Sequence, residues 1–346
     1  MKRIAGLALA AFALVGAAPL TVQVQTSGSS AELRGLAVRD AKTAWATGSQ
    51  GTVLRTRDGR TWEKVPIPGG EELDFRDVET PSKDVVVLMA AGPGEKSRIF
   101  RSMDAGATWK LVYTNPDPEG FYDAMAFWDE KNGLLVGDPV KEMQGAFRVL
   151  LTSDGGATWK PIPGGTIAFA LKGEGIFAAS GTCLTTVPGG KRAWFVTGGA
   201  RMSRVFRTLD GGQHWNSAPA PVPAGNASSG LFSVAFLDDA TGFASGGDYK
   251  QPKLESLNGA RSGDGGRTWT PAPISASGFY SGVVAVPGAK GRLVVAGPVG
   301  IAVSEDAGRT WAAIDRTPLN AVAFGADGAG WAVGPKGTIV RLERGR

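Results

Sequence analysis

The chain has 346 residues and a formal net charge of +5, from 37 Lys and Arg against 32 Asp and Glu. Its Lys and Arg residues are scattered, which argues against a nucleic-acid or lipid-headgroup surface. One cysteine, Cys183, and one histidine, His214, make a disulfide framework, a Ser-His-Asp triad or a multi-histidine metal site implausible. The 51 Gly and 21 Pro favour many short strands and tight turns, and therefore an all-β fold.

Residues 1–18 have the layout of a secretory signal peptide. Lys2 and Arg3 precede an apolar run from Ile4 to Val15, and small residues follow at 16–18. The run is too short to span a bilayer comfortably, although an uncleaved membrane anchor is the alternative. We therefore expect export to the periplasm or beyond, with a single mature domain over residues 20–346.

The first segment after the signal is expected to be a β-strand. Residues 21–26 read Thr-Val-Gln-Val-Gln-Thr, an alternation of apolar and polar side chains that is typical of a half-buried strand. This strand has no turn motif or partner strands of its own nearby. We expect it to complete a sheet formed elsewhere in the chain.

An eight-residue pattern, Ser/Thr-x-Asp-x-Gly-x-Thr-Trp, recurs six times, once in a shortened form and once with His214 in the Thr position. Successive aspartates are 42 to 56 residues apart, which suits a four-stranded propeller blade. Each copy follows an apolar strand, so we expect a hairpin turn in which the Asp accepts hydrogen bonds, the Gly has a positive φ and the Trp fills space between layers. The Asp and Trp residues of the six copies are Asp58, Trp62, Asp104, Trp109, Asp154, Trp159, Asp210, Trp215, Asp264, Trp269, Asp306 and Trp311.

A pair of apolar strands upstream of each turn motif is a second recurring feature, and the number of these pairs gives the number of blades. Seven such units are predicted to begin near Leu33, Phe75, Tyr122, Ile167, Phe232, Tyr280 and Leu319. The last unit lacks the turn motif and ends after three strands. We expect residues 21–26 to supply its outer strand and to close a seven-bladed β-propeller of four-stranded antiparallel blades.

The starts of the inner strands are expected to meet at one rim of the central channel and to form a binding surface. Long loops at 116–120, 185–192 and 247–260 are expected to add to recognition, the last through an aromatic anchor flanked by charge. The alternative is that these strand-end residues only hydrogen-bond neighbouring blades. The predicted surface comprises Arg34, Arg76, Asp77, Tyr122, Asp123, Ser233, Asp248, Tyr249, Tyr280, Ser281 and Asn320. No catalytic residue, metal or cofactor is expected.

The turn motif is similar to the Asp-box, or bacterial neuraminidase repeat, which several propeller families share. Seven units with Gly48-Ser-Gln-Gly-Thr-Val-Leu-Arg55 in the first and Gly334-Pro-Lys-Gly-Thr-Ile-Val-Arg341 in the last resemble the photosystem II stability/assembly factor family. The resemblance covers roughly residues 30–345. It implies a non-catalytic propeller that holds a protein client during assembly, with membrane proteins among the candidate clients.

Two enzyme classes that share the repeat are the alternatives. A sialidase would carry a Phe/Tyr-Arg-Ile-Pro signature, which is absent here, since Ser97-Arg-Ile-Phe100 lacks its proline. A glycoside hydrolase needs two carboxylates, for which Asp77 and Asp123 are candidates, although xyloglucan-cleaving hydrolases use two facing propellers and this chain has length for one. A substrate-sized pocket over the channel mouth would favour a carbohydrate-active propeller, and a flat rim a scaffold.

The string Gly173-Glu-Gly175 is similar to a dinucleotide-binding fingerprint. No Asp or Glu follows between residues 176 and 209 to hold a ribose, and no helical periodicity follows either. We therefore expect an ordinary glycine-containing loop.

Overall fold

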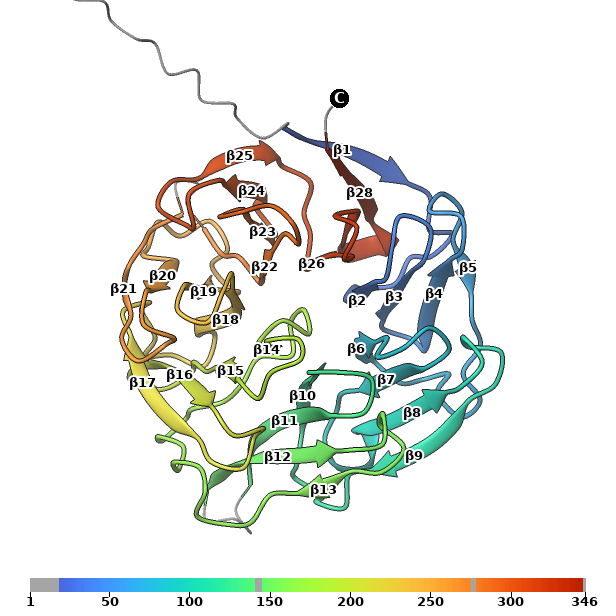
Figure 1. The fold of residues 1–346 in the computed structure, drawn as a ribbon, viewed down its shortest axis with the longest axis horizontal. Coiled ribbons are helices and arrows are strands. Elements are labelled where there is room, and N and C mark those ends of the chain that lie inside the picture. The colour runs from blue at the N-terminus through green and yellow to red at the C-terminus, as the bar shows by residue number, and fades with distance from the viewer. Residues whose placement is uncertain (1–18, 141–144, 275–277, 345–346) are drawn as a thin grey trace, which may run out of the picture.

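Short apolar strands joined by glycine-containing turns arrange the chain into a ring of seven four-stranded antiparallel sheets around a central channel (Figure 1). The computed structural model describes residues 19–140, 145–274 and 278–344, so the predicted signal peptide lies outside the described residues. Within these ranges no helix has the length and apolar character needed to cross a membrane. The prediction of an all-β, seven-bladed propeller is confirmed.

Each blade runs outward from the channel. Blades 1 and 2 comprise β2 (Leu33–Val38), β3 (Ala44–Gly48), β4 (Thr52–Thr56) and β5 (Glu63–Lys64), then β6 (Phe75–Glu79), β7 (Val86–Ala90), β8 (Arg98–Ser102) and β9 (Lys110–Thr114). Blades 3 and 4 comprise β10 (Tyr122–Phe127), β11 (Gly133–Val140), β12 (Ala146–Thr152) and β13 (Lys160–Pro161), then β14 (Leu184–Thr186), β15 (Ala193–Val196), β16 (Ser203–Thr208) and β17 (Asn216–Ala220).

Blades 5 and 6 comprise β18 (Ser229–Phe236), β19 (Gly242–Asp248), β20 (Gly259–Ser262) and β21 (Thr270–Pro271), then β22 (Gly282–Ala285), β23 (Leu293–Gly297), β24 (Gly300–Ser304) and β25 (Ala312–Asp315). Blade 7 comprises β26 (Ala321–Phe324), β27 (Gly330–Val333), β28 (Ile339–Arg344) and, on its outside, β1 (Leu20–Gln25). Two 3₁₀ turns, Gly94–Lys96 and Pro335–Gly337, lie in connections.

The hydrophobic core lies between the blades. Every residue of the middle strands β3, β7 and β23 is buried, because each of these sheets packs against a neighbouring sheet on both faces. Between blades 3 and 4, the rings of Phe147 and Phe195 lie 5.5 Å apart, centroid to centroid, and Phe195 stacks on Phe206 at 4.5 Å. Burial on both faces therefore explains why these strands read as continuous apolar runs.

The predicted closure of the ring is confirmed, with the strand one residue earlier than expected. Strand β1 pairs antiparallel with β28, from Leu20 opposite Arg344 to Gln25 opposite Ile339. The first described strand and the last one therefore lie side by side at the outer edge of blade 7 (Figure 1). This pairing covers an edge of β28 that would otherwise be open to other chains.

The six repeated turns have the predicted hydrogen bonds. In the third copy, Asp154 Oδ1 accepts from the Thr158 backbone N–H (2.9 Å) and Oδ2 from the Thr158 hydroxyl (2.6 Å), while Gly156 has a φ of 82°. His214 Nδ1 replaces that hydroxyl in the fourth copy, 2.7 Å from Asp210 Oδ2. These carboxylates brace local turns, and four of the six Trp side chains are buried, with the other two partly buried.

The predicted start of blade 4 at Ile167 is wrong. Its inner strand is Leu184–Thr186, and the loop predicted at 185–192 is the end of this strand and the turn into β15. The apolar run Ile167–Leu171 instead begins a long connection, held by isolated bridges from Phe169 to Ala146 and from Gly175 to Gly198. The run is apolar because parts of it pack against blades 3 and 4, and not because it pairs as a strand.

Candidate binding site at the channel mouth

Four inner strands carry a β-bulge near their first residue. The pairing register shifts between residues 33 and 35 in β2, 75 and 77 in β6, 122 and 124 in β10, and 231 and 233 in β18. A bulge leaves one residue unpaired and re-aims its side chain. The four bulged residues, Arg34, Arg76, Asp123 and Phe232, all line one pocket of about 630 Å³.

The other blades complete this channel-mouth pocket. Ser281 and Asn320, which immediately precede β22 and β26, line it from blades 6 and 7. Blade 4 contributes Gly173 and residues 175–179 of its long connection instead of an inner strand. Because the lining comes from the start of so many inner strands, the pocket sits over one mouth of the central channel.

One wall of the pocket is aromatic. The rings of Phe177 and Phe232 stack with centroids 4.0 Å apart, and Tyr249 meets both edge-on at 6.2 Å. Phe279 lies 4.5 Å from Phe232 in an edge-to-face arrangement. Tyr249 is 46% exposed, so the wall reaches solvent at the pocket entrance.

The opposite wall is charged, and most of its groups already have partners. Arg34 lies 3.7 Å from Glu32, and Arg76 Nε donates to Asp74 at 2.8 Å. Asp138, at the far end of β11, accepts a hydrogen bond from the Ile176 backbone N–H (2.9 Å). Burial raises the pKa of Asp138 to about 6, despite that hydrogen bond.

Asp123 is the exception in this wall. Its side chain is buried, and among the described residues neither of its carboxyl oxygens has a hydrogen-bond partner. Burial raises the pKa of Asp123 well above the usual range of a carboxyl, and the negative charge of Asp138 adds to this. Arg76 and the nearby backbone N–H groups of Asp138 and Ala178, which lie outside hydrogen-bond geometry, oppose the rise.

A buried ion pair positions the loop from blade 4. Glu174 Oε1 accepts from Arg204 Nε (2.8 Å) and from the Thr197 hydroxyl (2.6 Å), and a second Arg204 nitrogen bonds both Glu174 Oε2 and the Phe169 carbonyl. The next residues, Gly175 to Ala179, line the pocket. The expectation of a plain loop here is correct, but the sequence did not reveal that the loop forms part of a site.

The structure brings together Arg34, Arg76, Asp123, Tyr249, Ser281 and Asn320 of the predicted surface. Ser281 and Asn320 also bear out the alternative interpretation, since the Ser281 hydroxyl donates to the Asn320 carbonyl (2.6 Å) and the Asn320 amide to the Leu33 carbonyl (2.9 Å). Ser233 likewise accepts from the Val283 N–H (2.8 Å) of the next blade, and it does not line the pocket.

Four other residues of the predicted surface, Asp77, Tyr122, Tyr280 and Asp248, do not line this pocket. Asp77 accepts from the N–H groups of Val78 (2.8 Å) and Met125 (2.6 Å), and burial raises its pKa to about 7. Asp248 caps its own loop by accepting from the Lys250 N–H (2.9 Å). The two tyrosines are core residues, because each lies just before the position that turns toward the channel.

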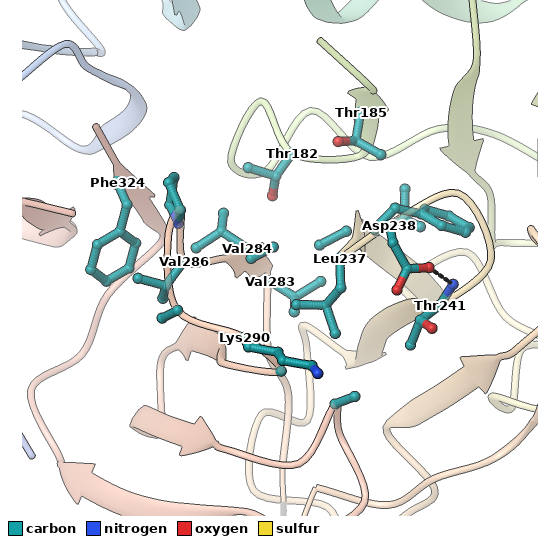
Figure 2. A pocket seen from close by; sticks show the side chains of 18 of the residues that line it. Thr182, Thr185, Leu237, Asp238, Thr241, Val283, Val284, Val286, Lys290 and Phe324 are labelled. Carbon is teal, nitrogen blue, oxygen red and sulfur yellow. Dashed lines mark hydrogen bonds between the residues drawn. The ribbon is translucent and has the colours of Figure 1, made fainter. Parts of the chain in front are cut away.

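The ends of the inner strands surround a second, larger pocket of about 1060 Å³ (Figure 2). Its lining mixes aliphatic side chains, with Val283, Val284 and Val286 on one side, and polar ones. Each of its three carboxyl groups has a partner: Asp238 accepts from the Thr241 N–H (2.6 Å), Glu305 from Arg292 Nε (2.9 Å) and Asp306 from the Thr310 N–H (2.8 Å). Among the described lining residues, none has a buried polar atom without a partner. The smaller channel-mouth pocket is therefore the better candidate site. No group of described side chains forms a metal site.

Comparisons with known proteins give two kinds of relative. No family model matches the chain. A xyloglucanase of Paenibacillus is 26% identical over 258 residues, which is 64% of this chain and 23% of that protein. The chloroplast photosystem II stability/assembly factor of Arabidopsis thaliana is 25% identical over 251 residues, 60% of each chain. The chain thus spans about a quarter or less of the length of the xyloglucanases it matches.

Among solved structures, YCF48 bound to a D1 peptide superimposes with a TM-score of 0.67 at 16% identity, over 96% of this chain and 99% of that one. YCF48 from Cyanidioschyzon merolae gives the same TM-score over 93% and 98%. The chain has the fold of the photosystem II assembly factors. A xyloglucanase from Xanthomonas campestris reaches a TM-score of 0.60 but is covered over only 53% of its length. The predicted resemblance to the assembly factors is therefore confirmed at the level of the fold.

Proposed function

We propose that this protein is an exported, non-catalytic propeller that holds a protein client during assembly, and that the client binds at the channel-mouth pocket without a cofactor. The observation that carries the proposal is the pocket itself, which six blades and one long loop build from re-aimed side chains. A rigid scaffold with an exposed aromatic anchor beside charged groups suits recognition of a polypeptide. The solved complex of YCF48 with a D1 peptide, which shares this fold over nearly all of both chains, supports a protein as the ligand.

A carbohydrate-active propeller is the second candidate, and two observations favour it. The pocket is large enough for a small substrate, and it holds two carboxyl groups with raised pKa values, Asp123 and Asp138. The second carboxyl group is thus Asp138, and not Asp77 as the sequence suggested. The higher TM-score with YCF48, 0.67 against 0.60 for the xyloglucanase, supports the scaffold over this candidate.

A crosslinking pull-down from the native membrane fraction tests the proposal. The bait variant Ala227→Trp places a large side chain at an exposed position that lines the pocket. The matched control, Ala240→Trp, makes the same change at an exposed position of the turn between β18 and β19, at the opposite end of the blade. We expect one protein to be enriched by the wild type and the control, and lost with Ala227→Trp.

Other outcomes would redirect the assignment. Enrichment that survives Ala227→Trp would place the client elsewhere on the ring. If no protein is enriched while the purified protein binds or cleaves xyloglucan oligosaccharides, the carbohydrate-active alternative replaces the scaffold.

A further inference from the structure

We propose that the Asp123 carboxyl group is the receptor for a cationic side chain, Lys or Arg, of the client polypeptide. This inference rests on the proposed function and specifies the chemistry that the pocket selects. Among the described residues of the pocket lining, Asp123 is the one whose buried side-chain oxygens have no hydrogen bond.

A buried carboxyl group without partners is costly to a folded protein. Asp123 is 1% exposed, and taking a polar group out of water without a hydrogen bond lowers the stability of the folded state. The bulge in β10 leaves Asp123 unpaired and turns its side chain toward the pocket, a direction that a regularly paired residue at this position would not have. A group that reduces stability and faces a cavity is expected to serve binding.

The remaining charges of the pocket do not meet this need. The Arg76 guanidinium donates to Asp74 and, through Nη1, to the Ala178 carbonyl (3.4 Å), and Arg34 lies beside Glu32. Asp138 adds a second carboxyl group to the same lining. The unmet group is therefore an acid, and a ligand that satisfies it must donate hydrogen bonds and preferably carry positive charge.

The aromatic wall further restricts which ligands fit the pocket. The stacked rings of Phe177 and Phe232, with Tyr249 edge-on and half exposed at the entrance, offer apolar surface to a flexible stem and ring faces to a cation. A pocket lined by both a carboxyl group and aromatic rings suits an ammonium or guanidinium on an aliphatic stem. It suits an acidic side chain poorly, because the like charge would be desolvated beside Asp123.

The protonation of Asp123 fits this role. The ionisable groups that face it are Asp138 on β11, Arg76 on β6 and the buried Cys183 just before β14. In the empty pocket, burial and Asp138 raise the pKa of Asp123, so the carboxyl group keeps its proton to a higher pH than an exposed one. A cation bound against it favours the ionised form, and binding should therefore release a proton and become tighter as pH rises.

The test uses small probes with matched neutral analogues. Binding of N-acetyl-lysine methylamide is compared with that of N-acetyl-norleucine methylamide, and N-acetyl-arginine methylamide with its citrulline analogue, by titration followed with NMR at millimolar concentrations. We expect each cationic probe to bind at least tenfold more tightly than its neutral analogue, which corresponds to about 1.4 kcal/mol. Calorimetry in two buffers of different ionisation enthalpy should detect the released proton.

Asp123→Asn is the decisive variant, and Asp77→Asn is its matched control on the neighbouring inner strand, outside the pocket. Asp123→Asn should abolish the preference for cations and keep or raise the melting temperature, because it removes a buried ionisable group that no protein group satisfies. A purely structural carboxyl group would instead show a lower melting temperature and unchanged probe selectivity. Asp77→Asn should leave probe selectivity unchanged.

Equal binding of charged and neutral probes, or no binding of either, overturns the inference. Binding of xyloglucan oligosaccharides without binding of the basic probes also overturns it and assigns the pocket to sugars. The two proposals fail separately. If a protein client is still captured by Asp123→Asn, the role of Asp123 is contradicted and the proposed scaffold function stands. If the cationic probes bind but no protein client is found, the cation site stands and the scaffold function is contradicted.

Discussion

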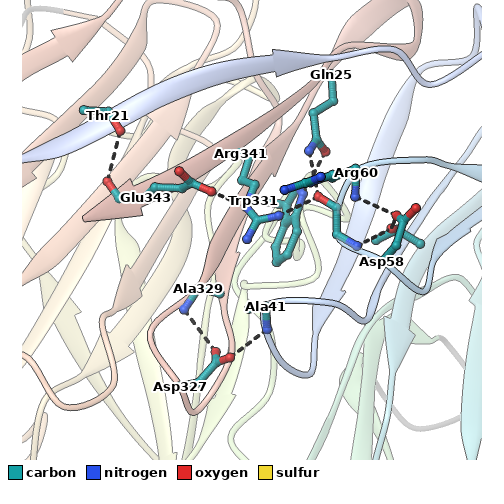
Figure 3. Close-up of polar contacts among 12 residues, drawn as sticks. Thr21, Gln25, Ala41, Asp58, Arg60, Asp327, Ala329, Trp331, Arg341 and Glu343 are labelled. Carbon is teal, nitrogen blue, oxygen red and sulfur yellow. Dashed lines mark hydrogen bonds and ion pairs between the residues drawn. The ribbon is translucent and has the colours of Figure 1, made fainter. Parts of the chain in front are cut away.

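Replacement of Gln25 by alanine should open the seam that closes the ring. Gln25 Oε1 accepts hydrogen bonds from two indoles, Trp62 Nε1 of blade 1 (2.9 Å) and Trp331 Nε1 of blade 7 (3.0 Å), and its Nε2 donates to the Gly59 carbonyl (2.8 Å). Figure 3 shows Gln25 beside Trp331 and Arg341. One amide thus joins β1 to the first and the last blade. Strand β1 has little other anchoring by side chains, because only Leu20 of its six residues is buried.

The magnitude follows from which partners can find water. Trp331 is fully buried, so its N–H group would stay unsatisfied, at a cost of about 1–3 kcal/mol. Trp62 is partly exposed and should recover some of its loss, and the Gly59 carbonyl keeps a hydrogen bond from Arg341 Nη1 (2.6 Å). We expect Gln25→Ala to lower the free energy of unfolding by about 2–4 kcal/mol.

Urea unfolding, followed by tryptophan fluorescence, measures this change. Gln25→Glu should lose less, because a carboxylate still accepts from both indoles and gives up only the donor to Gly59. Gln23→Ala, at an exposed position of the same strand, is the matched control and should stay within about 0.5 kcal/mol of wild type. If Gln25→Ala were no more destabilising than Gln23→Ala, the reasoning that this amide fastens the ring would be refuted.

Three further changes have defined outcomes. Arg204→Met strands the buried Glu174 carboxylate, so we expect a loss of roughly 3–5 kcal/mol and faster amide hydrogen exchange in residues 167–183, with much of the stability restored when Glu174→Met is added. Asp264→Ala should lower the melting temperature at neutral pH, and the difference from wild type should shrink in acid. Hydrogen bonds hold the folded-state pKa of Asp264 at about 2 despite partial burial, so the stabilisation by this carboxylate is lost as the pH falls from the unfolded-state pKa toward that value. The melting temperature of Asp138→Asn should rise relative to that of wild type between about pH 4 and pH 7. A folded-state pKa raised to about 6 means that the native carboxyl group reduces stability as the pH rises through that window. A difference in melting temperature that did not change with pH would contradict the raised pKa.

The repeats predicted the blades because each turn depends on residues close in sequence. Asp154 accepts hydrogen bonds from Thr152 and Thr158, and the Gly156 N–H donates to the Thr152 hydroxyl. All of these contacts lie within seven residues, so the sequence pattern contains the whole local geometry. Closure by the first strand could also be predicted, because an alternating strand without a sheet and a sheet without its outer strand imply each other.

Features that depend on distant pairing could not be predicted in this way. The run Ile167–Leu171 has the composition of an inner strand, and only the pair between Glu174 and Arg204, thirty residues apart, shows that this segment is a pocket-lining loop. A bulge cannot be predicted from the sequence either, because nothing in Tyr122-Asp123-Ala124 distinguishes a regular strand from one in which Asp123 is left unpaired. The signal for Asp138 was weak but present, as a charged residue directly after Gly137 in an otherwise apolar middle strand.

Because of the bulges at the channel mouth, the pocket is built from separate positions whose side chains can be replaced one at a time. At each one, the residue is left out of the pairing, the register shifts by one residue, and the backbone on either side still pairs with the next strand. A substitution at Arg34, Arg76, Asp123 or Phe232 should therefore alter what the ring accepts with little disturbance to the sheet beneath. A library restricted to these four codons would be a compact route to propellers with new ligand preferences on an unchanged frame.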